Sequence, residues 1–253
     1  MKGKSKLTWL LAMVFALSFV LAACAGGSDT SDGDKDTEKP KEPDNEASGE
    51  AVEGGDLILA VLSDASSLDP AGSNDVPSSV VQQNIYETLV NRDDENNIIE
   101  GLAVEWDAVD ERTYEFKLRE GVKFHDGEDF NAEVVKMNLE RILDEEVASP
   151  RYFLFEMIES VDVIDEYTVQ ITTEYPFAPL YAHLSHNGGA MVSPKSIEED
   201  YAAMEGGAKS GTVVSENPVG TGYFKFDSWS PGSEIKLGKN DDYWGDKVHV
   251  DSV

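Results

Sequence analysis

The stretch NPVGTGYFKFDSW (residues 217–229) places a proline and two glycines directly before an aromatic run. Gly220 and Gly222 permit backbone angles that are closed to other residues, and they let another backbone or a ligand approach closely. The aromatic run and the turn signal Pro231-Gly232 predict a β-hairpin after the loop. In a simpler interpretation the loop only enters this hairpin and contacts no ligand, because glycine and proline are ordinary turn residues.

The residues upstream of this hairpin predict a mixture of strands and helices. Leu57–Leu62 is an uninterrupted apolar run of strand length, which is typical of a central strand buried on both faces. Helices are expected at three places. The first starts at Pro77, with an inner stripe of Val81, Ile85 and Leu89. The second is capped by Asn131, with a stripe of Val135, Leu139 and Ile142, and the third has Ser193 as its cap and Pro194 in its first turn, with Ile197, Tyr201 and Met204. Two further hairpins are expected, one across Tyr114–Phe124 and one that pairs Val161 and Val163 with Val169 and Ile171. Strands and helices do not alternate regularly, so the fold class is α/β of the mixed, α+β kind.

Residues 1–23 have the pattern of a lipoprotein signal peptide. Three lysines precede an apolar run that is short for a membrane-spanning helix and that ends in small residues before Cys24. Cys24 is the only cysteine, so no disulfide can form within the chain. The tetrapeptide Leu-Ala-Ala-Cys resembles the lipobox of bacterial lipoproteins, which implies cleavage before Cys24 and lipid attachment to its sulfur. The alternative is an ordinary signal peptide with a chance cysteine.

The chain is strongly acidic, with 50 Asp and Glu residues against 20 Lys and Arg and a net charge of −30. Such a field disfavours nucleic acid and anionic membrane surfaces as partners. Residues 24–53 hold many acids and no aromatic residue, so they cannot bury enough apolar area to offset the entropy of ordering. They are expected to form a flexible tether between Cys24 and a folded part that begins at residue 54.

Three segments, taken in order, resemble the extracytoplasmic solute-binding proteins of family 5, which serve ABC importers for oligopeptides, dipeptides and nickel. The segments are LDPAGSNDVPSSVVQQNIYETLV (68–90), GLAVEWDAVDERTYEFKLREGVKFHDGEDFNAEVVKMNLERIL (101–143) and NPVGTGYFKFDSWSPGSEIKLGKNDDYWG (217–245). The resemblance implies a periplasmic-binding-protein-like fold of type II. It also implies a lipid-anchored protein outside the cytoplasm that captures peptides and delivers them to an ABC permease, with no catalytic chemistry and no cofactor.

The resemblance also implies a division into domains. Residues 54–92 and 171–253 are expected to form an incomplete first lobe, and residues 93–170 a small α+β domain inserted into it. Members of the family are considerably longer, so the chain is expected to be an N-terminal fragment whose second lobe is missing. Because that lobe supplies the other side of the ligand cleft, weak peptide binding or none is expected of the chain alone.

By the same resemblance, several residues are expected to face the ligand. They are Asn74 and Asp75, His186 and Asn187, and the glycine loop of Gly220, Thr221 and Gly222. A peptide in such a cleft can be held largely through its main chain, as an added strand is. For Asn74 and Asp75, an Asx turn that caps the following helix is an equally supported alternative.

Metal and catalytic interpretations have less support. His183 and His186 lie three residues apart, which is compatible with a metal such as nickel, but no third ligand is near them in sequence. His125 stands beside Asp126, yet the Asp126-Gly127 pair is turn chemistry, so a structural role away from the cleft is expected. The sequence contains no nucleophile elbow, P-loop or zincin helix. The alternatives that remain are a nickel chelate or another solute bound by the same fold and, with less support, a secreted hydrolase.

Overall fold

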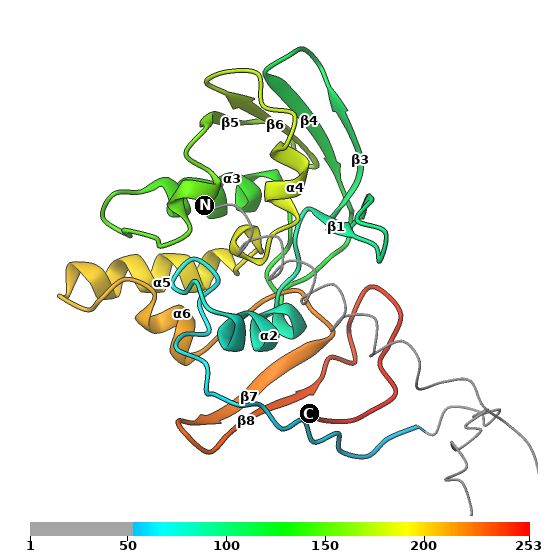
Figure 1. Cartoon of the computed structure of the whole chain (residues 1–253), viewed down its shortest axis with the longest axis vertical. Helices are drawn as coiled ribbons and strands as arrows, with labels where there is room; N and C mark the ends of the chain where they lie inside the picture. The colour runs from blue at the N-terminus through cyan, green and yellow to red at the C-terminus, as the bar shows by residue number, and fades with distance from the viewer. Residues whose placement is uncertain (1–52) are drawn as a thin grey trace, which may run out of the picture. The chain divides into compact units, whose positions relative to one another are not determined.

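The computed structural model describes residues 53–253, which belong to one compact unit (Figure 1). The predicted signal peptide, Cys24 and the predicted tether up to residue 52 lie outside the described residues. The elements, in chain order, are α2 (Val76–Ile85), β1 (Val90–Arg92), β2 (Ile98–Glu100), β3 (Ala103–Ala108), β4 (Thr113–Leu118), α3 (Ala132–Leu143), η1 (Tyr152–Leu154), β5 (Ile158–Asp165), β6 (Thr168–Thr173), α4 (Leu180–Leu184), η2 (Asn187–Gly189), α5 (Pro194–Glu205), α6 (Thr212–Glu216), β7 (Phe224–Ser230) and β8 (Glu234–Lys239).

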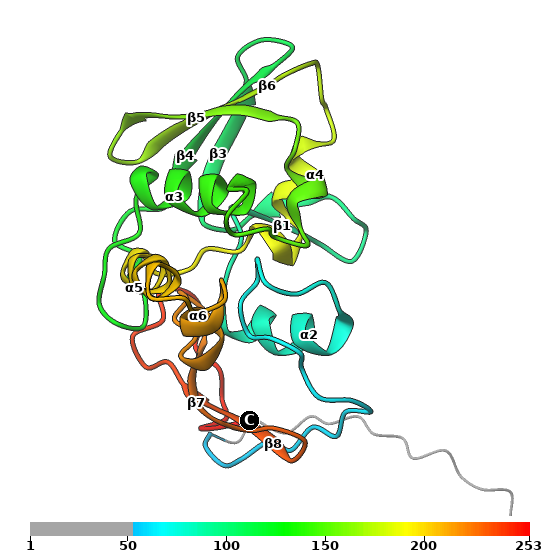
Figure 2. The same cartoon turned by 90° about the vertical axis from the view of Figure 1, so that its left-hand side faces the viewer.

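A four-stranded antiparallel sheet of order β3-β4-β6-β5 forms one end of the molecule. Helix α3 lies across one face of this sheet, as Figure 2 shows in the turned view. Every second residue of β4 is apolar and buried on the face of the sheet that the helix covers; these residues are Tyr114, Phe116 and Leu118. The alternation therefore places one face of β4 in the hydrophobic core, as the period of a strand requires.

Helix α3 forms where the sequence predicts it. Asn131 has extended backbone angles, and its side chain accepts a hydrogen bond from the Val134 amide, which caps the helix. The predicted stripe of Val135, Leu139 and Ile142 is buried against the sheet. The cap and the stripe together determine where this helix begins and which face it buries.

The remaining elements form the other end of the molecule. Helix α2 lies beside the β7–β8 hairpin, and α5 and α6 lie together between this hairpin and α3 (Figures 1 and 2). A second hydrophobic cluster holds these elements together, with Ile85, Val192, Ile197, Phe224 and Leu237 among its buried members. The β7–β8 hairpin turns at Gly232, whose φ of 77° is in the left-handed region that glycine tolerates. This hairpin, the β5–β6 pair and the helix from Pro194 are confirmed predictions.

The expected central strand at Leu57–Leu62 is wrong. The segment belongs to no named strand, and Ile58 and Leu62 are fully or almost fully exposed. Its start is held by a bridge between Asp56 and Ser252, by a hydrogen bond from the Leu57 amide to the Ser252 carbonyl, and by further hydrogen bonds between residues 53–56 and 249–252. An apolar run predicts a buried strand only when other elements cover it, and none of the described elements does so.

Three local predictions also need correction. β4 does not form a hairpin with Val122–Phe124 but pairs with β3 and β6, because Gly121 has a φ of 75° and turns the chain away. The side chain of Ser193 does not cap α5; its hydroxyl donates to Asp126. Leu89 lies beyond α2, which ends at Ile85, although it is buried.

The expected domain division remains a prediction. Strand β6 continues past residue 170, where the inserted domain was expected to end. The hydrophobic cluster under the sheet also includes Ala71, Leu184 and Val219 from outside residues 93–170.

Candidate functional site

The residues expected at the ligand gather around helix α2. Asp75 caps its first turn, with Oδ1 accepting from the Ser78 amide at 2.9 Å. Burial raises the pKa of Asp75, but hydrogen bonds from Ser66 and Ser78 outweigh it and hold the pKa below its ordinary value. Asp75 therefore has the role of the Asx-turn alternative, and its oxygens are occupied by the chain's own donors.

Asn74 precedes this cap and is exposed. Its Oδ1 accepts a hydrogen bond of 2.7 Å from Nη1 of Arg151, a residue that the sequence analysis did not single out. Arg151 is only 3% exposed, and its Nε donates to the Ser73 carbonyl at 2.6 Å while Nη2 donates to Ser79 at 3.2 Å. Arg151 thereby holds the loop before α2 from beneath. No local pattern in the sequence marks it, because these three acceptors lie more than 70 positions away.

His186 reaches the same arginine from another part of the chain. Its Nδ1 accepts a hydrogen bond of 3.0 Å from the Gly188 amide, and its Nε2 lies 3.4 Å from Nη1 of Arg151. Burial lowers the pKa of His186, and the charges of Arg151, His183 and Arg92 lower it further. The structure therefore brings two predicted residues, Asn74 and His186, together on a guanidinium that was not predicted.

Asn187 lies apart from this cluster. It is buried, and its Nδ2 donates to Oε1 of Gln82 at 2.6 Å. Gln82 in turn donates to the Ser67 and Asp69 carbonyls, each at 3.0 Å. Asn187 thus links the segment of η2 to the buried face of α2.

The glycine loop lies at the opposite end of α2. A Cβ on Gly222 would lie 2.7 Å from the Ile85 carbonyl oxygen, and a Cβ on Gly220 would overlap the same oxygen. The Gly222 amide also donates to this carbonyl at 2.9 Å. The close approach that the glycines permit is therefore to the last turn of α2. A helix of this length is about 15 Å long, so the loop and Asn74 are separated by about that distance.

Thr221 joins the loop to Glu87 just beyond α2. Thr221 is fully buried, and its hydroxyl donates to Oε2 of Glu87 at 2.7 Å. Tyr243 and Trp244 donate to the same carboxylate at 2.8 and 2.9 Å. Burial raises the pKa of Glu87, although these three hydrogen bonds favour its charged form.

His125 braces the glycine loop from the other side. Its amide donates to the Gly220 carbonyl at 2.9 Å, and its Nε2 lies 2.9 Å from the Gly222 carbonyl. Because a carbonyl only accepts, Nε2 carries the proton and donates. Burial lowers the pKa of His125 to about 4, so the imidazole is neutral near pH 7. The turn has the expected structural role, but it lies directly against the glycine loop.

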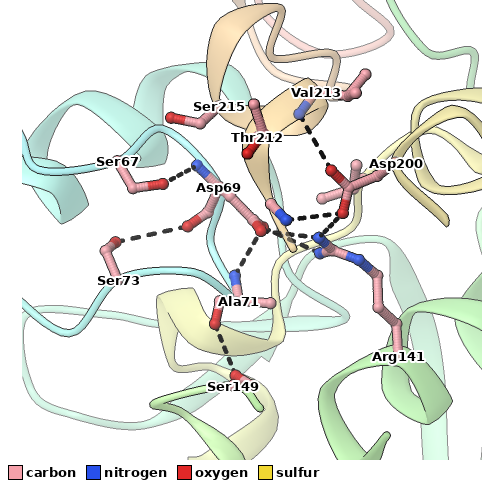
Figure 3. A network of polar contacts seen from close by, with 12 residues as sticks. Ser67, Asp69, Ala71, Ser73, Arg141, Ser149, Asp200, Thr212, Val213 and Ser215 are labelled. Carbon is pink, nitrogen blue, oxygen red and sulfur yellow. Dashed lines mark hydrogen bonds and ion pairs between the residues drawn. The ribbon is translucent and has the colours of Figure 1, made fainter. Parts of the chain in front are cut away.

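A buried ion triad connects α3, α5 and the loop before α2 (Figure 3). Arg141 donates two hydrogen bonds to Asp69, at 3.0 and 2.8 Å, and one to Asp200 at 3.0 Å. Asp200 also accepts from the Gly211 and Val213 amides, at 2.8 and 3.1 Å. Burial lowers the pKa of Arg141, but the two carboxylates more than offset it and raise the pKa above its ordinary value. The triad fixes Asp69, which stands only a few residues before Asn74.

The two histidines considered as metal ligands point to other partners. Nδ1 of His183 lies 2.6 Å from the Leu154 carbonyl, while His186 contacts Gly188 and Arg151. Within residues 53–253 no group of three or more His, Cys, Asp or Glu residues is arranged to hold a metal ion.

None of the helices in this part of the chain has the length and apolar character needed to cross a membrane.

Similarity to known proteins identifies the family. The family model for the middle part of bacterial extracellular solute-binding proteins, family 5, matches residues 97–253. The glutathione-binding protein GsiB of Escherichia coli K12 is 37% identical over 190 residues, which cover 75% of this chain and 35% of GsiB. The chain therefore spans about a third of the length of such relatives.

Solved structures show the same likeness. DppA of Helicobacter pylori, described as a periplasmic binding protein in complex with the peptide STSA, matches with a TM-score of 0.70 and 34% identity over 79% of this chain and 42% of that one. NikZ of Campylobacter jejuni in complex with Ni(L-His) matches with a TM-score of 0.68 and 28% identity over 78% of this chain and 38% of that one. These likenesses confirm the mixed α/β, periplasmic-binding-protein-like fold, and the chain belongs to the bacterial extracellular solute-binding proteins of family 5.

Proposed function

We propose that this chain captures oligopeptides or dipeptides outside the cytoplasm for delivery to an ABC permease. The observation that carries the proposal is the family match over residues 97–253. Relatives named for glutathione, which is a tripeptide, and for the peptide STSA favour peptides among the solutes of the family. No catalytic step is part of this function.

The surface around α2 supplies the ligand contacts in this proposal. Asn74 and His186 lie at its first turn with exposed and partly exposed side chains, so a ligand along the helix would meet them directly. The glycine loop lies at its last turn, where Gly220, Thr221 and Gly222 are buried, so it would shape this end of the surface from beneath. An extended peptide rises about 3.3 Å per residue, so the helix length of about 15 Å matches four or five residues. Asp75, Asn187 and Thr221 would act from behind, because their side chains bind groups of the chain itself.

Attachment to the membrane through lipid on Cys24 is part of the same proposal. Its support is the lipobox-like tetrapeptide at the end of the predicted signal peptide. Two or more acyl chains are enough to hold a soluble domain at a bilayer. Mass spectrometry of Cys24 from cell membranes should find a diacylglyceryl group, and an unmodified thiol there would contradict this part.

Peptide capture can be tested by NMR on the ¹⁵N-labelled chain, which detects weak binding. The peptide STSA and glutathione should each cause saturable shifts of the amides of Asn74, Gly188 and Gly222. A matched control is the Arg112→Gln variant, which changes an exposed arginine paired with Glu159 on the sheet and should leave these shifts intact. Saturable shifts at other amides that leave Asn74, Gly188 and Gly222 unchanged would contradict this site, and submicromolar binding would contradict the expectation that the chain alone binds peptide weakly or not at all.

A nickel chelate is the second candidate ligand, because the solved structure of NikZ contains Ni(L-His). Native mass spectrometry with Ni²⁺ alone and with Ni²⁺ plus histidine separates the two cases. Retention of the histidine complex without retention of peptide would favour this candidate.

A further inference from the structure

Within residues 53–253, Arg151 has no carboxylate partner, although the chain has 50 acidic residues. Among residues 53–253 no carboxylate lies within 4.0 Å of its guanidinium, and its three assigned acceptors are a carbonyl, an amide oxygen and a hydroxyl. Asp75 is the acidic group whose field reaches it, but the oxygens of Asp75 bind Ser66 and Ser78. Arg151 is 3% exposed, and a buried guanidinium with no carboxylate in contact among the described residues is costly, so this site favours an incoming anion.

Other basic groups act on His186, which lies beside this arginine. Arg92 donates to Ser185 and to the Ala182 carbonyl, and within the described residues it too lacks a carboxylate within 4.0 Å. The charges of Arg92, Arg151 and His183 all act on His186. The field at His186 is therefore positive, although the net charge of the chain is −30 and the charge of Asp75 acts on Arg151.

The contact between His186 and Arg151 brings two donors together. The Gly188 amide donates to Nδ1 of His186 at 3.0 Å, so Nδ1 carries no proton and Nε2 of the neutral ring must carry it. Nε2 faces Nη1 of Arg151 at 3.4 Å, and a guanidinium can only donate. Neither group satisfies the other. An acceptor between or above them would receive hydrogen bonds from both.

Asn74 adds a third donor at the surface. Its Oδ1 accepts from Arg151, which assigns Nδ2 to the opposite side of the amide. Nδ2 has no acceptor among the residues that the structure describes, and the side chain is exposed. The accessible donors are thus Asn74 and the partly exposed His186, while Arg151 supplies charge from beneath.

We infer that the Asn74–Arg151–His186 cluster binds a carboxylate of the peptide ligand and selects peptides that can place one there. The inference rests on the proposed function and names its specificity. Carboxylate oxygens fit because each has two lone pairs and can accept from two of these donors. The carboxylate can come from an acidic side chain or from the peptide C-terminus.

Isosteric probe pairs test the inference on the complete chain. The side-chain pair is N-acetyl-glutamate methylamide against N-acetyl-glutamine methylamide, and the C-terminal pair is N-acetyl-glycylglycine against its amide. At millimolar concentrations the acid of at least one pair should shift the Gly188 amide and the ring nitrogens of His186 in ¹⁵N NMR. Its amide should bind at least roughly tenfold more weakly, because a hydrogen bond to a charged group contributes that much.

Variants test whether Arg151 causes the preference of acid over amide. Arg151→Gln should remove the preference of acid over amide, and Arg151→Lys should restore part of it because the charge remains. Arg112→Gln makes the same change of net charge at an exposed site and should leave the preference intact.

Two results would overturn the inference. One is equal binding of acid and amide in both pairs, and the other is an unchanged preference in Arg151→Gln. Binding of STSA and glutathione with no acid preference would overturn the specificity while leaving peptide capture in place. Acid binding without any peptide binding would instead contradict the proposed function.

Discussion

Arg141 and Arg151 are both almost completely buried, at 2% and 3% exposure, but their surroundings are opposite. Arg141 binds two carboxylates that are themselves 1% exposed. Among the residues that the structure describes, Arg151 binds only neutral oxygens and faces a histidine. Two arginines ten positions apart therefore differ in whether the chain itself supplies the counter-charge. The charge of Arg141 is already balanced by carboxylates, whereas the site around Arg151 can still accept an anion.

Replacing Arg141 should have the largest effect on stability. Arg141→Met leaves Asp69 and Asp200 buried without a cation, which should lower the free energy of unfolding by about 3 to 5 kcal/mol. Chemical denaturation followed by circular dichroism measures the change.

The control for this prediction is Arg112→Met. Arg112 pairs with Glu159 at an exposed site, so its loss should change the free energy of unfolding by less than about 1 kcal/mol. Equal losses in the two variants would show that the triad contributes no more than a surface ion pair.

His125 is a buried titratable group that stays neutral, in contrast to the two buried arginines. Its folded pKa of about 4 lies below the ordinary value of 6.5, so the unfolded chain binds a proton more readily between these values. The free energy of unfolding is therefore highest with respect to this group above pH 6.5, where His125 is neutral in both the folded and the unfolded chain. It falls by up to roughly 3 kcal/mol as the pH drops toward 4. His125→Gln should flatten the pH dependence of the free energy of unfolding in this window. Parallel curves for the two proteins would refute the assignment.

Substitutions in the glycine loop test how much the free energy of unfolding depends on close backbone packing rather than on a buried charge. Gly220→Ala places a methyl group against the Ile85 carbonyl and should cost about 1 to 3 kcal/mol. Gly238→Ala on β8 meets nothing within 4 Å and serves as the matched substitution with little effect. Thermal unfolding compares them, and a tolerated alanine at 220 would mean that the loop does not depend on this contact.

Replacing Arg151 should have the smallest effect on stability. Arg151→Met leaves neutral acceptors rather than charges without a partner, so the cost should be about 1 kcal/mol, well below that of Arg141→Met. Because the charge of Arg151 lowers the pKa of His186, that pKa should rise in the variant. NMR titration of His186 measures it. A stability loss as large as that of Arg141→Met would remove the distinction between the two arginines.

Local patterns predicted several elements well. Asn131 and the stripe of Val135, Leu139 and Ile142 predicted α3, because a cap and a helical period act within a few residues. The Leu57–Leu62 run failed because the burial of a strand depends on neighbours that the run itself does not encode.

The candidate site was predicted only in part. The sequence marked Asn74 and His186, and both contact Arg151, which no pattern in the sequence marked. Arg151 lies 77 positions from Asn74 and 35 from His186, so no spacing rule connects the three. The ligand roles of Asn74, Asp75, His186, Asn187, Gly220, Thr221 and Gly222 remain predictions.

The amino-acid sequence by itself determined the family, the mixed α/β class and the helix and hairpin signals, since these depend on short motifs and local periodicity. Only the tertiary structure decided that the glycines accommodate the Ile85 carbonyl, that Asp69 and Asp200 neutralise Arg141, and that Arg151 contacts no carboxylate among the described residues. The physical reason is that burial and charge compensation depend on which distant segments meet, and the energy of a buried charge depends on those neighbours more than on the residue that carries it.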